Sequence, residues 1–370
     1  MTKPYAYAAL AATAAVDSDP THPDGTAWPE GWNFPLDNAG VWPPGWPPDI
    51  TEPTVYMSSS SNDYHSNDGG TTITKTASPA HSNFQDMWGT GHYMYATQTP
   101  GGGGNVIDVY LSLDGGYNWE KRGTATPSNG SSVHNVGITL ASGRIIIPGG
   151  DGVAIYSDNA GVTFSESDTG AGTSAEAGEI LQIADGTVLY FVYGAGLTPN
   201  NTTYTSADNG ATWADAGGTP IPNTHRPYYT WAPDNGSTVV YAHSSSSSYI
   251  YLSTDSGVTM TLVKTITGSR QPKGLAGSGT DAVLLHSLSP SPYTIGSYYT
   301  ENSGATWAEG TTLTGETHTT MGDTGRHLAV WANGYVAAGN NLWGSTDVTG
   351  FAKLNTTTDM SASVGTLSSS

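Results

Sequence analysis

The chain has 370 residues, of which only 11% are charged, against about 25% in an ordinary soluble protein. Its formal net charge of −20 repels phosphate backbones and anionic lipid surfaces, so the composition argues against nucleic acid and membrane partners. It has no cysteine, which excludes disulfides and thiolate metal sites, and no apolar run approaches the roughly 18 residues of a membrane span.

Residues 1–53 differ in composition from the rest. Their Ala-rich start, 1–16, loosely resembles a secretion signal, but its apolar stretch is weak, so we assign it to the mature protein. A segment rich in Trp, Pro and Gly follows, and its prolines predict an extended arm. The indoles either pack on the arm's own domain or anchor it on another protein chain; they belong to Trp28, Trp32, Trp42 and Trp46.

From residue 54 onward a short motif recurs, best seen at 206–213. Its shared glycine stands at positions 70, 116, 161, 210, 257 and 304, and a degenerate seventh copy surrounds position 350. The intervals of 45 to 49 residues are the length of one four-stranded blade. The many Gly, Thr, Tyr and Trp residues also indicate a β-protein.

Each copy has the chemistry of a tight turn. Ser or Thr opens it and Asp or Asn stands two residues later, where both side chains can bond backbone amides. The glycine is expected to have positive φ, and Thr and a large apolar residue then start the next strand. We assign a structural role to the acidic or amide position of all seven copies: Asp68, Asp114, Asn159, Asp208, Asp255, Asn302 and Asp347.

Short β-strands are predicted between the copies. After the third copy they cover 179–183, 187–193 and 202–205, and after the fourth copy 227–231, 238–243 and 249–252. Together with the strand that follows each turn, every complete repeat has four strands. The first copy is preceded by only one obvious strand, 54–58.

The copies resemble the Asp-box, Ser-x-Asp-x-Gly-x-Thr-Trp, of bacterial neuraminidase repeat proteins. The resemblance implies a β-propeller over 54–358, with each box between the third and fourth strands of a blade and away from the usual binding face. Seven boxes favour seven blades, one of them completed by strands from both termini; six blades with an added hairpin are the alternative. Residues 359–370 are predicted to be a C-terminal tail.

The chain lacks the residues expected of a sialidase in this superfamily. Sialidases hold a carboxylate with three arginines and use a Tyr–Glu nucleophile pair with an Asp acid/base, whereas this chain has five arginines in all. The Arg-Ile-Pro signature expected before the first box is missing. Another glycosidase would need two carboxylates about 5–10 Å apart. The candidates for such a pair are Asp86, Glu176 and Glu179, which no motif ties together.

A ligand site is expected in the loops that lead into the innermost strand of each blade. Polar residues recur there and form either a ring around the channel mouth, able to bind an anionic or sugar ligand, or ordinary caps of strand ends. They are His81, His134, Glu176, His225, Arg226, Arg270, Lys273 and His318. Tyr228, Tyr229 and Trp231 could stack on sugars but are more typical of blade packing. No cofactor and no metal are expected.

The sequence therefore predicts a non-enzymatic binding or assembly protein. We expect an extracellular protein or a component of a virion surface, such as a bacteriophage decoration, fibre or receptor-binding protein, whose arm contacts other chains. The alternatives are a secreted glycoside hydrolase and a factor that assembles a larger complex.

Overall fold

The computed structural model describes about two thirds of the chain as regular elements and their connections. The described residues are 55–59, 62–66, 73–77, 84, 86–90, 93–98, 106–112, 116, 119–127, 137–172, 175–194, 201–218, 220–244, 247–288, 294–317, 328–331, 334–339, 341–354 and 364–369. The Trp/Pro-rich arm lies outside them. In the described part, no helix is long and apolar enough to cross a membrane.

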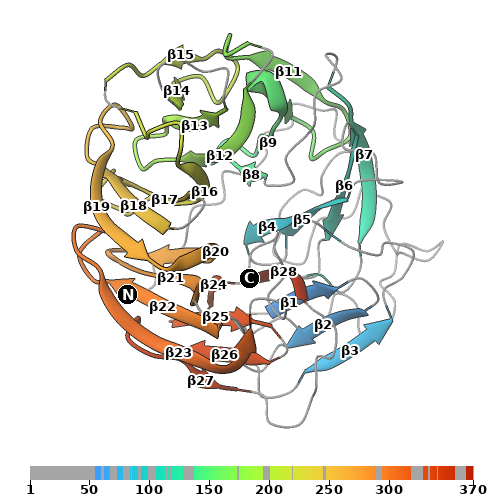
Figure 1. Cartoon of the computed structure of the whole chain (residues 1–370). Coiled ribbons are helices and arrows are strands. Elements are labelled where there is room, and N and C mark those ends of the chain that lie inside the picture. The colour runs from blue at the N-terminus through green and yellow to red at the C-terminus, as the bar shows by residue number, and fades with distance from the viewer. Residues whose placement is uncertain are drawn as a thin grey trace, which may run out of the picture.

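The strands form seven four-stranded antiparallel sheets, here called sheets 1 to 7 (Figure 1). Sheet 1 contains, from the inside outward, β28 (Val364–Ser369), β1 (Val55–Ser59), β2 (Asn62–Ser66) and β3 (Thr74–Ala77). Sheet 2 contains β4 (Asp86–Thr90), β5 (Tyr93–Gln98), β6 (Ile107–Ser112) and β7 (Glu120–Ala125). Sheet 3 contains β8 (Ile138–Thr139), β9 (Ile145–Pro148), β10 (Val153–Ser157) and β11 (Ser165–Asp168), with a short 3-10 helix, η2 (Gly150–Gly152).

The remaining four sheets continue in chain order. Sheet 4 contains β12 (Glu176–Gln182), β13 (Val188–Tyr193), β14 (Thr202–Ser206) and β15 (Ala214–Asp215). Sheet 5 contains β16 (Arg226–Trp231), β17 (Thr238–His243), β18 (Ser247–Ser253) and β19 (Thr261–Thr267). Sheet 6 contains β20 (Ser269–Ser278), β21 (Asp281–Leu288), β22 (Thr294–Thr300) and β23 (Ala308–Thr317). Sheet 7 contains β24 (Leu328–Trp331), β25 (Gly334–Ala338), β26 (Leu342–Ser345) and β27 (Ala352–Lys353).

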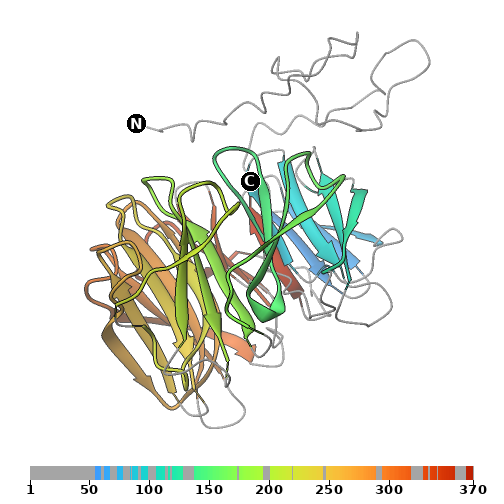
Figure 2. The same ribbon diagram turned by 90° about the horizontal axis from the view of Figure 1, so that it is seen from above.

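The sheets are arranged in a ring, so the expected β-propeller is confirmed (Figure 1). The first strand of each sheet is innermost (Figure 1). Innermost strands of neighbouring sheets contact one another, including β28 with both β4 and β24, and between sheets 3 and 4 β12 contacts β9 and η2. In the view turned by 90°, the strands run between the two faces of the ring (Figure 2). The expected C-terminal tail is wrong for 364–369, because these residues form β28 and pair antiparallel with β1. Both termini therefore contribute strands to sheet 1.

The hydrophobic core lies in the seams between neighbouring sheets. Each seam from sheets 1 and 2 to sheets 6 and 7 contains one cluster of buried side chains. Because both faces of a sheet pack against a neighbour, a second strand such as β13 is buried along its whole length. The outer strand β11, at the rim of the ring, is mostly exposed. Burial on two faces explains why β13 is uniformly apolar rather than alternating.

The repeated motif forms a hydrogen-bonded turn, here called the repeat turn, between the third and fourth strands. In sheet 4, the Ser206 hydroxyl donates to Asp208 Oδ1 at 2.7 Å and accepts from Gly210 N at 2.7 Å. Asp208 also accepts from the amide of Thr212 at 2.9 Å and from its hydroxyl at 2.6 Å. These bonds hold the pKa of Asp208 at about 2, the two bonds from Thr212 being the largest causes.

The same bonds recur in sheets 3, 5 and 6. The opening hydroxyl accepts from the glycine amide in each, and the acidic or amide oxygen accepts from the Thr amide. The glycines have the positive φ that was expected. The residue before each glycine also has positive φ, which sequence reasoning missed; these residues are Ala160, Asn209, Ser256 and Ser303. In sheet 7, Asp347 bonds the Thr349 amide without a glycine turn, while Asp68 and Asp114 lie outside the described residues.

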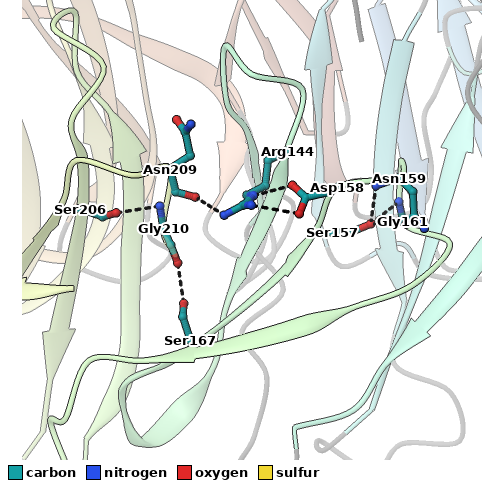
Figure 3. Close-up of polar contacts among 9 residues, drawn as sticks. All are labelled: Arg144, Ser157, Asp158, Asn159, Gly161, Ser167, Ser206, Asn209 and Gly210. Carbon is teal, nitrogen blue, oxygen red and sulfur yellow. Dashed lines mark hydrogen bonds and ion pairs between the residues drawn. The ribbon is translucent and has the colours of Figure 1, made fainter. Parts of the chain in front are cut away.

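Repeat turns also join neighbouring sheets. Arg144 lies between two turns, with a bidentate pair to Asp158 of sheet 3 at 2.6 and 3.0 Å and a bond to the Asn209 carbonyl of sheet 4 at 3.0 Å (Figure 3). The Ser167 hydroxyl of sheet 3 donates to the Gly210 carbonyl of sheet 4 at 2.6 Å. The repeat turns therefore stabilise both their own hairpins and the seams between neighbouring sheets.

Candidate functional site

Antiparallel order places the repeat turns and the predicted site at opposite ends of the sheets. A repeat turn joins the third strand to the fourth, whereas the predicted site residues stand where the innermost strand begins. Since neighbouring strands run in opposite directions, the end of the second strand lies beside the start of the innermost one. A site at this end consequently combines residues from both strands.

Five residues form a contiguous group at this end of sheets 4 and 5, here called the Arg226 cluster. They are Glu176, Tyr193, Arg226, Tyr228 and His243. Pairing register explains their proximity, because Glu176 is opposite Tyr193 in sheet 4 and Arg226 is opposite His243 in sheet 5.

The guanidinium of Arg226 lies over two tyrosine rings. Its central carbon is 4.7 Å from the ring centroid of Tyr193 and 5.0 Å from that of Tyr228. Such cation–π contacts stabilise the cation while leaving its N–H edge unused. Arg226 is half-buried, and among the described residues no hydrogen bond or ion pair involves its guanidinium. This leaves an oriented, unpaired cation at the end of an innermost strand.

Tyr193 connects the cation to a carboxylate. Its hydroxyl donates to Glu176 Oε2 at 2.6 Å. Tyr193 is only 7% exposed, whereas Glu176 is exposed. Burial raises the pKa of Tyr193, the hydrogen bond to Glu176 raises it further, and the charge of Arg226 opposes the change. The phenol is therefore neutral and a hydrogen-bond donor at ordinary pH.

A second aromatic contact surrounds His225, one residue before Arg226. The imidazole stacks on Tyr249 with centroids 3.7 Å apart, and its Nδ1 is 2.6 Å from the Tyr251 hydroxyl. Burial lowers the pKa of His225 and raises that of Tyr251 to about 12. His225 is thus neutral at pH 7 and is engaged with its own sheet.

A bulge at the start of the innermost strand shapes this end of three consecutive sheets. The pairing register shifts between Ala177 and Ile180 in β12, between Pro227 and Tyr229 in β16, and between Pro272 and Gly274 in β20. In β16 the extra residue is Tyr228, one of the rings on Arg226. Bulges of this kind re-aim side chains near sites.

The predicted ring is only partly assembled in the described residues. Glu176 and Arg226 come together, but Lys273 is 1% exposed, and its ammonium donates to Gln271 Oε1 at 3.2 Å. The expectation of an accessible Lys273 is wrong, because this bulge residue of β20 is buried. His81, His134 and His318, as well as the side chain of Arg270, lie outside the described part. No group of three or more His, Asp or Glu in the described residues could hold a metal.

The candidate carboxylate pair of a glycosidase is not accessible. Glu179 is 6% exposed and Asp86 is 1% exposed, so Glu176 alone of the three faces solvent. Glu176 does form a Tyr–Glu pair, the combination that sialidases use. Of the described arginine side chains, Arg122 and Arg144 bond carbonyls of repeat turns, which leaves Arg226 beside the pair.

Sequence reasoning missed Tyr193 and His243. Both end a second strand, and the hairpin register that brings them to Glu176 and Arg226 was the available signal. Tyr228 was considered as a sugar platform or as packing, and it contacts Arg226 and His243. Tyr229 and Trp231 are buried in the seam between sheets 5 and 6, as blade packing requires.

No protein-family model and no curated protein matches this chain. Solved structures do match it. A GH74 enzyme of Niastella koreensis has a TM-score of 0.57 at 12% identity over 80% of this chain, which spans about half of that enzyme (51%). A protein of Lactobacillus plantarum has a TM-score of 0.62 at 11% identity, over 86% of this chain and 99% of its own. YCF48 bound to D1 peptide has a TM-score of 0.51 at 12% identity, over 78% and 88%. At such identities the similarity shows the propeller fold alone.

Proposed function

We propose that this chain is a non-enzymatic binding protein whose ligand contacts the Arg226 cluster. The observation that carries this proposal is the guanidinium of Arg226, which contacts the rings of Tyr193 and Tyr228 and has no hydrogen-bond or ion-pair partner among the described residues. Removing part of a charged group from water without a partner costs free energy, and this cost favours a partner for Arg226. Since no described residue provides that partner, we propose that an external anionic group does.

The chemistry of the cluster favours a small ligand with one carboxylate and several hydroxyls. Because the two rings supply no hydrogen-bond acceptor in their π faces, the N–H groups of Arg226 remain available for a bidentate bond to a carboxylate. Glu176 can accept from a hydroxyl, and exposed parts of Tyr228 can stack on a sugar ring. The net charge of −20 opposes polyanions, so a singly charged acidic sugar fits better than a sulfated polymer.

Binding should depend on Arg226 and not on charge alone. A glycan array containing acidic sugars supplies hits, whose affinities are then measured by calorimetry for Arg226→Gln, Arg226→Lys and Lys353→Gln. Lys353 is exposed in β27 and provides a control with the same change in net charge. We expect Arg226→Gln to weaken binding about tenfold or more, because hydrogen bonds to charged groups contribute about 1.5–3 kcal/mol. Arg226→Lys should also weaken it, since the planar fork is lost. Equal affinities for Arg226→Gln and Lys353→Gln would refute this site.

A glycoside hydrolase is the second candidate, because of the Tyr193–Glu176 hydrogen bond. The raised pKa of Tyr193 disfavours the phenolate that a nucleophile needs. Incubation with chromogenic glycosides separates the two functions: turnover that disappears in Tyr193→Phe supports the hydrolase, and binding without turnover supports the first proposal. An assembly role through a peptide partner, as the name of the YCF48 complex suggests for that protein, is tested by pull-down with full-length chain.

We also infer that each of the seven four-stranded sheets is one blade. The contacts between neighbouring sheets all around the ring and the pairing of β28 with β1 support seven blades over six with an added hairpin. The repeat turns support membership of the Asp-box superfamily. We further propose an extracellular or virion-surface location with the arm, including Trp42 and Trp46, on another chain. Cross-linking of intact particles or secreted complexes, followed by mass spectrometry of arm peptides, tests this.

A further inference from the structure

One residue of the Arg226 cluster contacts both of its charges. The Tyr193 hydroxyl donates to Glu176 at 2.6 Å, and the ring of the same residue lies 4.7 Å from the Arg226 guanidinium carbon. The same charges act on the pKa of this phenol in opposite directions, Glu176 raising it and Arg226 lowering it. Tyr193 is almost fully buried and therefore fixed, while Glu176 is exposed at the start of β12.

Opposite charges this close would ordinarily pair. No ion pair within 4.0 Å joins Glu176 and Arg226, both of which are fully described. A hydrogen bond from a buried donor to a carboxylate is stronger than an ion pair between partly exposed groups, because solvent screens the ion pair and ordering two long side chains costs entropy. For the Glu176 carboxylate, the hydrogen bond from Tyr193 is therefore more favourable than an ion pair with Arg226.

We infer that Tyr193 is a positioning residue that holds Glu176 away from Arg226 and thereby keeps the guanidinium available to an anionic ligand. This inference rests on the proposed binding function. Without the hydroxyl, Glu176 is free to rotate onto Arg226, and the site is closed by its own carboxylate. The phenol acts through Glu176 and needs no contact with ligand.

Chemical modification of Arg226 tests this role without a ligand. Phenylglyoxal reacts with unpaired guanidinium groups, and mass spectrometry of the peptide containing Arg226 gives the rate. Four proteins are compared: the chain without substitution, Tyr193→Phe, Glu176→Gln and the double variant. Phenylalanine keeps the ring on Arg226 and removes only the hydroxyl. Arg144, which is paired with Asp158, is an internal control in every sample.

We expect Tyr193→Phe to slow modification of Arg226 about threefold, which corresponds to one partly exposed ion pair. The double variant should return to the original rate, and Glu176→Gln alone should leave it unchanged. Equal slowing in Tyr193→Phe and the double variant would mean disturbed packing and would overturn the inference. If Tyr193→Phe does not fold, faster modification in Glu176→Gln would overturn it, since Glu176 would then already pair with Arg226.

Titration with D-glucuronate by calorimetry separates this inference from the proposed function. Weaker binding by about threefold in Tyr193→Phe supports both. If no acidic sugar binds the chain without substitution while the rates of phenylglyoxal modification follow the expected pattern, the binding proposal fails and the positioning role stands. If the chain without substitution and Tyr193→Phe bind D-glucuronate equally, the positioning role fails and the binding proposal stands.

Discussion

Replacing Asp208 by alanine should destabilise the protein by about 1–2 kcal/mol. The change removes bonds from the Ser206 hydroxyl, the Thr212 amide and the Thr212 hydroxyl. Hydrogen bonds to a carboxylate contribute about 1.5–3 kcal/mol each when buried, but Asp208 is exposed and water replaces the acceptor. The loss should therefore resemble that of a capping residue, about 0.5–2 kcal/mol.

Asparagine provides the matched control. Asn159 and Asn302 occupy the equivalent position in sheets 3 and 6, where each accepts from the Thr amide at 2.9 Å and donates to the Thr hydroxyl. Asp208→Asn should thus keep the turn and cost less than about 0.5 kcal/mol at pH 7. Urea unfolding of the three proteins gives the comparison. If both variants lose the same stability, or alanine loses none, the hydrogen-bond account of the turn is refuted.

The charge of Asp208 adds a pH dependence. Its folded pKa of about 2 is below that of an unfolded Asp, about 3.9, so the folded state binds the proton more weakly. The stabilisation is complete above about pH 5 and disappears as pH falls through 4 toward 2. The difference between the original chain and Asp208→Asn should therefore shrink between pH 7 and pH 3. A constant difference would show that the charge does not contribute.

Gly210 tests the packing between sheets 3 and 4, and His286 tests the effect of a buried titratable group on stability. Gly210→Ala places a Cβ 2.6 Å from Ile146 Cδ1 at φ +80°, whereas Gly236→Ala has the same φ and open space around it. Both substitutions should lose about 1 kcal/mol of stability because alanine is strained at positive φ. Only Gly210→Ala should lose about 1–3 kcal/mol more, from overpacking. Urea unfolding midpoints measure both losses, and equal losses would contradict the contact between Gly210 and Ile146 across the seam. His286 is buried with its Nδ1 unbonded, and burial lowers its pKa to about 4. An unfolded His takes up its proton near pH 6.5, about 2.5 pH units above the folded state, so the stability of the protein falls as pH drops from 6.5 toward 4. In the same assay, His286→Leu should therefore lose less stability between about pH 7 and about pH 4.5 than the chain without substitution. Parallel pH profiles would disprove the burial of a neutral His286.

Much of the fold could be predicted because each blade is built from local signals. The expected strand 238–243 coincides with β17, and the repeat turns stand where the motif predicted them. The assignment of a C-terminal tail was wrong for 364–369. The pairing of β28 with β1 joins the two ends of the chain, and no local periodicity carries information about such a distant partner.

The site was harder to predict than the fold, for a related reason. Glu176 and Arg226 were identified because they precede or begin predicted strands. Tyr193 is 17 residues after Glu176 and becomes its neighbour only through the register of one hairpin. Lys273 was expected to be accessible, but a bulge in β20 places it where it is buried. A one-residue shift of register reverses the direction of a side chain, and composition does not reveal it.

The two ends of the sheets differ in how completely their polar groups are satisfied, and this difference supports the proposed location of the binding site. In the repeat turn of sheet 4, both oxygens of Asp208 accept hydrogen bonds, and the carbonyls of Asn209 and Gly210 are bonded by the preceding sheet. Such a turn has little capacity left for a ligand, and its recurrence in several sheets is explained by seam stability. At the other end, Arg226 is held by rings that give it no hydrogen-bond acceptor. Among the described residues Arg226 therefore has no protein acceptor, and an anion that binds it in the folded state would stabilise the fold.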